Sequence, residues 1–220
     1  MRRIITSLLA GGALSAALVG IAFVPSDSAM SADHLDPPTR TDAGFDATPD
    51  VPADIADVFA WHSNGTVKIA MTFAGPVATT DPLHYDRDVL YKIHISTKAP
   101  GTTDEFTIRA RFGKGSGDKD WGVRFEGVPG VGTIEGPVEA TLEKDGVKAR
   151  AGLFDEPFFF DLIGFRETRS FGEIRIRNNR NFFDGQNDTA IVFEIPDAKF
   201  GGDVSQLELW GQTLRFGGNL

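Results

Sequence analysis

Short blocks in which apolar and polar residues alternate constrain the fold of this chain more than any other feature of its sequence. The clearest block runs from Phe106 to Phe112, where every second residue is apolar and the residues between are Thr or Arg. A period of two predicts a strand with one buried and one solvated face. Weaker blocks of the same kind lie at residues 57–62, 67–73, 89–97, 121–126, 138–143, 147–153, 190–195 and 207–216.

Turn signals separate these blocks at short intervals. The sequence Lys144-Asp145-Gly146 predicts a tight hairpin turn between two of them, and the chain holds 25 glycines. A length of 220 residues with 41% hydrophobic content is enough for one packed core. We therefore predict a mainly antiparallel, all-β, β-sandwich-like single domain with one short helix and long loops.

The first 31 residues have the pattern of a signal peptide. Arg2 and Arg3 precede an apolar run from Ile4 to Val24, and small residues follow it. We predict cleavage near Ser31 and a periplasmic or secreted protein, with an uncleaved anchor as the alternative. No later stretch is apolar enough to span a bilayer, so the cleaved protein is not expected to be integral to a membrane.

Residues 32–53 are rich in Pro and Asp and predict an extended leader that packs on a β-rich domain at residues 54–220. The one short helix is predicted at Pro157 to Arg166, with Glu156 as its N-cap. Residues 171–186 are basic and rich in Asn, which indicates a long loop. Long loops in compact domains are often functional or flexible.

Charge and cysteine content exclude several classes of function. The net charge is −9, which opposes the phosphate attraction that a general nucleic-acid binder needs. The chain has no cysteine and therefore no disulfide, thiolate metal site or cysteine nucleophile. No serine lies in a Gly-x-Ser-x-Gly motif, and we predict no catalytic residue.

The sequence FDEPFFFD sets carboxylates beside a phenylalanine cluster: Asp155 and Glu156 precede it and Asp161 follows. Two interpretations stay open. In one, the carboxylates cap a helix and Asp161 pairs with an arginine such as Arg166. In the other, the carboxylates lie against apolar surface and need hydrogen bonds or a hard cation such as Ca²⁺ to stay ionised.

Other acidic residues could contribute ligands. His34 and Asp36 are two residues apart in the leader, and Asp54 and Asp57 lie at the start of a predicted strand. The alternative is a solvated histidine and turn-forming aspartates. The loop DGQNDT could add polar support from Asp184, Asn187 and Asp188, although it is shorter than an EF-hand loop and lacks the closing Glu.

The order of these segments resembles the exported bacterial family catalogued as domain of unknown function 4331. The likeness covers roughly His34 to Pro196 and rests on SADHLDPP, DIADVFAW, DRDVLYKIHI, AGLFDEPFFFDLIGF and NDTAIVFEIP. The family usually has Asp-Asp-Pro-Phe where this chain has Asp155, Glu156, Pro157 and Phe158. The resemblance implies no established activity, but it favours one shared acidic site over independent caps and turns.

We therefore expect an exported binding or structural module, stabilised by a divalent cation such as Ca²⁺ or by polar contacts that tie the leader to the helix. The predicted ligands are His34, Asp36, Asp54, Asp57, Asp155 and Glu156, with support from Asp161, Asp184, Asn187 and Asp188. One alternative is a hydrolase of extracellular polysaccharide that uses a carboxylate pair such as Asp57 and Glu156. Another is an envelope-associated module that binds a partner through an exposed apolar patch.

Overall fold

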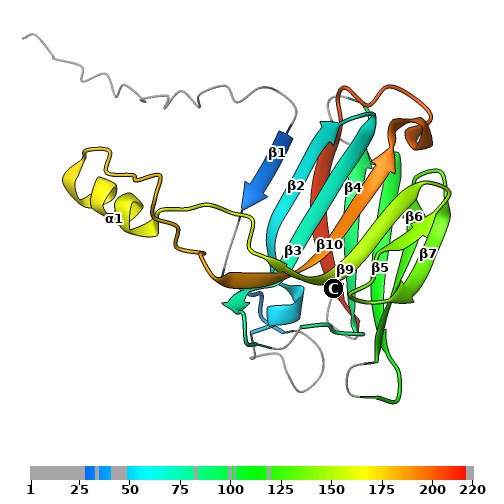
Figure 1. Cartoon of the computed structure of the whole chain (residues 1–220), viewed down its shortest axis with the longest axis horizontal. Coiled ribbons are helices and arrows are strands. Elements are labelled where there is room, and N and C mark those ends of the chain that lie inside the picture. The colour runs from blue at the N-terminus through cyan, green and yellow to red at the C-terminus, as the bar shows by residue number, and fades with distance from the viewer. Residues whose placement is uncertain are drawn as a thin grey trace, which may run out of the picture.

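The computed structural model describes residues 28–32, 35–40, 49–81, 84–98, 101, 103–117 and 120–216. In these residues two antiparallel sheets pack face to face, and an α-helix stands apart from both (Figure 1). The predicted all-β, sandwich-like architecture is confirmed.

The first sheet has six strands in the order β1-β2-β3-β10-β9-β8. Their bounds are Ser28–Ala32, Ile55–Ser63, Thr66–Ala78, Gln186–Pro196, Val147–Asp155 and Leu142–Lys144, in that order. The second sheet has five strands in the order β11-β4-β5-β6-β7, with bounds Glu208–Arg215, Val89–Ser96, Phe106–Lys114, Trp121–Val128 and Gly132–Pro137. The helices are the 3₁₀ turns η1 (Val51–Ala53) and η2 (Asp197–Phe200) and the α-helix α1 (Leu162–Phe171).

The core lies between the two sheets, where their inward-facing side chains meet. Phe125 packs edge-on against Phe193 at a centroid distance of 4.9 Å, and Phe73 lies 4.2 Å from Tyr91. All four side chains are fully buried. The period-two blocks predicted this arrangement because alternate residues of a strand point to opposite faces of its sheet.

The strand predictions fail at β1, most of which was assigned to the signal peptide, and between residues 132 and 143. β7 (Gly132–Pro137) was not predicted because its Gly and Pro residues hide any alternation. The block predicted at residues 138–143 is mostly turn, and Glu139 has a φ of 61° there. The predicted hairpin turn is present, with positive φ at Asp145 and Gly146, and it joins β8 to β9.

The one short helix is present, but it begins five residues later than the predicted Pro157 to Arg166, and the prediction of Glu156 as its N-cap is wrong. α1 begins at Leu162, and its N-cap is Asp161, whose Oδ1 accepts the Gly164 N–H at 2.9 Å. Glu156 instead continues the sheet, because its N–H donates to the Gln186 carbonyl at 3.0 Å. Residues 157–184, which we call the arm, leave the sheet after β9 and return to it at β10 (Figure 1).

Little of the predicted signal peptide falls within the described residues, since residues 1–27 lie outside them. β1 (Ser28–Ala32) pairs with β2 at the edge of the six-stranded sheet, so cleavage near Ser31 would remove most of this strand. No helix among the described residues has both the length and the apolar character needed to cross a bilayer.

The end of the leader is tied to the last strand by a buried ion pair. Arg215 of β11 pairs with Asp50, and its NH2 group also donates to Asp86 at 2.9 Å. Asp50 is 3% and Arg215 is 8% exposed. The leader therefore contributes a buried charged contact to the sandwich.

Candidate metal centre

Irregularities in two strands bring acidic side chains to one end of the six-stranded sheet. β2 carries a bulge between Ile55 and Val58, which contains Asp57. β10 shifts register against β3 at Asp188, between its neighbours Asn187 and Thr189. Bulges redirect side chains that a regular ladder would alternate, and here both lie beside β3.

Thr72 of β3 shows which face of the sheet carries the site. Met71 and Phe73 point into the core, so Thr72 between them points to the opposite face. Its Oγ1 accepts the N–H of Asp57 at 2.9 Å. Thr72 is nevertheless 1% exposed, so this end of the outer face is itself buried.

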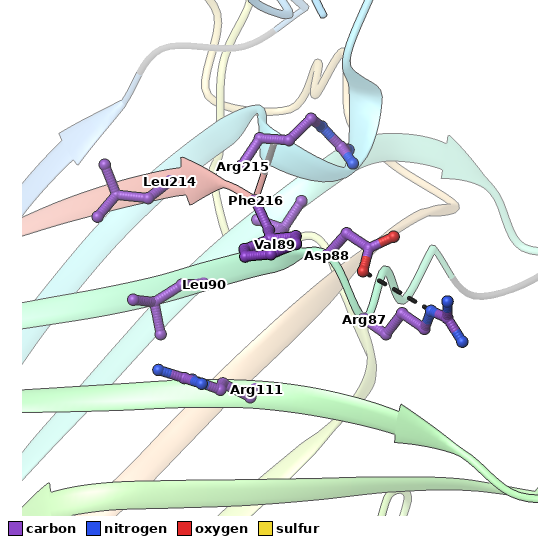
Figure 2. Close-up of a pocket in the computed structure, with 8 residues that line it drawn as sticks. All are labelled: Arg87, Asp88, Val89, Leu90, Arg111, Leu214, Arg215 and Phe216. Atoms are coloured by element: carbon purple, nitrogen blue, oxygen red, sulfur yellow. Dashed lines mark ion pairs between the residues drawn. The ribbon is translucent and has the colours of Figure 1, made fainter. Parts of the chain in front are cut away.

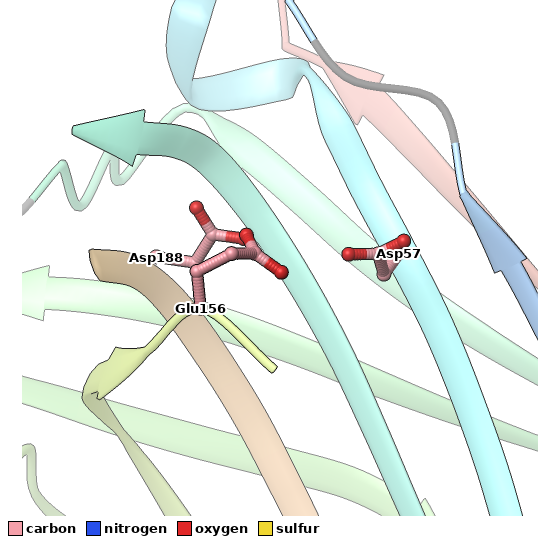
Figure 3. Close-up of side chains that lie close together, drawn as sticks. All are labelled: Asp57, Glu156 and Asp188. Atoms are coloured by element: carbon pink, nitrogen blue, oxygen red, sulfur yellow. The ribbon is translucent and has the colours of Figure 1, made fainter. Parts of the chain in front are cut away.

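Three carboxylates converge there, from Asp57, Glu156 and Asp188. One oxygen from each lies within 4.8 Å of the others. Figure 3 shows Glu156 and Asp188 side by side, with Asp57 facing them from β2 across β3. Asp57 and Asp188 are 0% exposed and Glu156 is 8% exposed, so the cluster is closed to solvent.

Asp188 is the member whose environment most needs a cation. Neither of its carboxylate oxygens receives a hydrogen bond of regular geometry from the described residues. The side chains of Glu156 and Thr72 nevertheless lie within reach of it and shift its pKa. A Cβ at Gly75 would lie 1.6 Å from Asp188 Oδ1. The carboxylate therefore occupies the space that any side chain at position 75 would need.

Burial and mutual repulsion dominate the electrostatics of the cluster. The pKa of Asp57 is raised above its ordinary value, first by burial and then by the charge of Glu156. The pKa of Asp188 is raised by burial, by Glu156 and by Asp57, and the effect of Thr72 only partly opposes this. Without a cation these carboxyl groups hold protons to relieve the repulsion.

The donor set selects the class of metal. All three ligands are carboxylates, whose six oxygens suit a hard cation, whereas Zn²⁺ sites usually include His or Cys. Ca²⁺ takes six to eight oxygens in flexible geometry, while Mg²⁺ usually keeps several waters. A closed site of buried carboxylates therefore fits Ca²⁺ best.

The structure brings together two of the six predicted ligands, Asp57 and Glu156. The third member, Asp188, was assigned only a supporting role in a separate loop. The sequence held a signal for the position of Asp188, because Asp188 lies two residues before the predicted strand at residues 190–195, and β10 includes it. The hydrophobic run after it could have identified it as a buried acid.

The other predicted residues lie elsewhere. Asp36, Asp155 and Asp184 are exposed, and His34 lies outside the described residues. Asp54 is buried and its carbonyl accepts the Ala74 N–H at 2.9 Å, while Asn187 is 9% exposed and pairs in register with Asp155. None of these belongs to the acidic cluster found among the described residues.

Asp161 lies at the base of the arm and has its own donors. It pairs with Arg180, not with Arg166, through contacts of 2.6 and 2.9 Å, and it accepts the Arg177 N–H at 2.8 Å. These contacts, led by that of Arg180, hold the pKa of Asp161 well below its usual range. Its side chain is buried, yet it needs no cation because four donors satisfy it.

Two surface hollows among the described residues lie away from the acidic cluster. The hollow in Figure 2, of about 370 Å³, is lined by Arg87, Asp88, Val89, Leu90, Arg111, Leu214, Arg215 and Phe216. A second, of about 250 Å³, lies over β9 and β10 and contains none of the three carboxylates. A catalytic pair must open into a cleft, so the burial of Asp57 and Glu156 argues against the hydrolase alternative.

Comparison with known proteins gives no relative for this fold and site. No protein-family model, no curated protein and no solved structure matches the chain. The resemblance described from the sequence therefore stays a prediction.

Proposed function

We propose that this protein is an exported structural or binding module, periplasmic or secreted, whose sandwich is stabilised by one Ca²⁺ held by Asp57, Glu156 and Asp188. The observation that carries the proposal is the fully buried Asp188 carboxylate, which receives no hydrogen bond of regular geometry from the described residues and faces two further acids. Three buried carboxylates without a cation would cost several kcal/mol in desolvation and repulsion.

The role of such a cation follows from the elements that it joins. Asp57 comes from β2, Glu156 follows β9, and Asp188 lies in β10. A single ion would therefore join three strands of one sheet at the base of the arm. Because the site is closed, the cation acts on stability and not on a substrate.

Metal analysis and thermal unfolding test the proposal together. Mass spectrometry of the purified protein should detect about one calcium per chain. Chelator should lower the melting temperature and added Ca²⁺ should restore it, because an ion bound only to the folded state stabilises it by mass action. The control is Asp155→Asn, which removes an exposed carboxylate next to the site and should leave the response to calcium unchanged.

A melting temperature that does not change across millimolar chelator, in protein that contains no metal, would refute the cation. The carboxylates would then be held by protons and hydrogen bonds alone.

A further inference from the structure

The arm displays apolar side chains that a soluble protein normally buries. Of the eleven large hydrophobic residues that are exposed in the described part of the chain, seven lie in the arm. Their exposed fractions run from 40% to 88%, and they are Phe159, Ile163, Phe165, Phe171, Ile174, Ile176 and Phe182. Such a concentration of exposed apolar side chains is typical of a surface that interacts with a protein or a membrane.

The arm is a built structure and not a loose loop. The segment that leaves the sheet and the segment that returns to it are hydrogen-bonded to each other. The Phe182 N–H donates to the Phe160 carbonyl at 2.8 Å, and the Phe160 N–H donates to Asn181 Oδ1 at 3.1 Å. The ion pair between the buried Asp161 and the partly exposed Arg180 fixes the start of α1. The exposed side chains are therefore held out by a folded support.

The charged residues of the arm differ from those of the sandwich. The arm holds five arginines, no lysine and four acidic residues, a net charge of +1. The rest of the chain holds 17 basic and 27 acidic residues, a net charge of −10. An anionic surface would therefore repel the arm less than it repels the rest of the chain taken together.

Three of the arginines are available to a partner. Arg166, Arg169 and Arg177 are exposed and form no ion pair with other described residues. A guanidinium group binds phosphate oxygens in a bidentate manner, which a lysine cannot do. Arg175 lies 4.1 Å over the ring of Phe171, so cation and apolar surface are presented together.

From these observations we infer that the arm docks this protein on an anionic phospholipid surface. The Phe and Ile side chains enter the boundary between headgroups and acyl chains, and the arginines contact the lipid phosphates. The projection of the arm in Figure 1 keeps the acidic sandwich away from the anionic surface. A protein partner would need acidic and apolar side chains placed to match those of the arm. An anionic phospholipid surface offers phosphate groups and acyl chains at every point.

Co-sedimentation with vesicles tests this inference. The full chain should bind vesicles that contain phosphatidylglycerol, bind vesicles of phosphatidylcholine alone at least about tenfold more weakly, and be released by salt. Phe171→Ser with Ile174→Ser and Ile176→Ser should lower binding about tenfold or more, since binding scales with buried apolar area. The matched control is Leu35→Ser with Phe216→Ser, two exposed positions outside the arm, and it should bind as the parent does.

A second pair of variants tests the arginines. Arg166→Gln with Arg169→Gln and Arg177→Gln should lower binding to anionic vesicles by about fivefold for each arginine removed. Arg87→Gln with Arg109→Gln and Arg111→Gln removes three exposed arginines of the sandwich and should have little effect. Unchanged melting temperatures would show that each variant is folded.

Three results would overturn the inference. They are no binding to vesicles, equal binding to neutral and anionic vesicles, and an equal loss of vesicle binding in the arm variants and in the sandwich variants. A fourth result could come from sedimentation of the protein without lipid. A concentration-dependent dimer that the Phe171, Ile174 and Ile176 substitutions dissociate would show that the arm binds a second copy of the chain instead.

Discussion

Asp188→Asn should change stability in opposite directions with and without calcium. Asn has nearly the same size as Asp but carries no charge, so the substitution tests electrostatics with little change in packing. In chelator it removes repulsion from a crowded site. In calcium it removes a charged ligand.

The magnitude follows from the spacing of the cluster. Two unit charges 4.8 Å apart repel by about 3.5 kcal/mol at an effective dielectric constant of about 20. Asp188 faces two such charges, and the protons that the site retains relieve much of this cost. We therefore expect Asp188→Asn to raise the free energy of unfolding in chelator by about 1–3 kcal/mol at mildly alkaline pH.

In calcium the parent protein gains about 2.7 kcal/mol when free Ca²⁺ exceeds its dissociation constant by about a hundredfold, and the variant should lose most of this gain. Urea denaturation followed by tryptophan fluorescence, with chelator and with calcium, measures both effects. Asp184→Asn, which changes an exposed aspartate of the arm, is the control. If Asp188→Asn lowers stability equally in chelator and in calcium, Asp188 serves a hydrogen-bond network and the reasoning is wrong.

Gly75→Ala should abolish most of the calcium response and lower stability, because its Cβ would lie 1.6 Å from Asp188 Oδ1. Gly113→Ala, whose Cβ would meet no atom within 4 Å, is the control for replacing a strand glycine without a clash. In chelator, the free energy of unfolding should fall as pH rises from about 4, because the raised pKa values of Asp57 and Asp188 make the folded state hold more protons than the unfolded state. The affinity of the site for Ca²⁺ should instead rise with pH. Parallel profiles of stability against pH in chelator and in calcium would contradict this. Arg215→Met leaves Asp50 as an uncompensated buried charge and should cost about 3–5 kcal/mol, whereas Arg87→Met at an exposed position should cost little in the same denaturation assay. Asp161→Ala should lower the denaturation midpoint more than Asp161→Asn, which keeps an acceptor for the Gly164 N–H. The loss of each variant relative to the parent should shrink at low pH, because the pKa of Asp161 is depressed and the parent loses the contribution of its ionised carboxylate there.

The sandwich was predictable because its signal is local. Each strand of the core carries its own alternation, as Phe106 to Phe112 does in β5, and a turn such as Asp145-Gly146 specifies its own backbone angles. α1 was misplaced because Pro157 and Glu156 fit the start of a helix by local preference alone. A pairing with Gln186, 30 residues away, holds Glu156 in the sheet instead, and no local pattern reports such a pairing.

The acidic cluster was half predictable for the same reason. Glu156 and Asp57 stood out because each is an acid next to apolar sequence. Asp188 joins them only because the β10 ladder shifts register opposite Ala74, Gly75 and Pro76, and the space at Gly75 admits its carboxylate. Register shifts depend on both strands of a pair, so one strand's sequence does not reveal them.

The arm begins and ends at neighbouring positions of one ladder. Asp155 at the end of β9 and Asn187 near the start of β10 are register partners. In topological terms the arm is therefore the enlarged loop of a β-hairpin, and a turn of a few residues could connect the same two strands. The pairing of β9 with β10 does not itself fix the length of such a loop, so the arm could be shortened or replaced while the strand pairings stay the same.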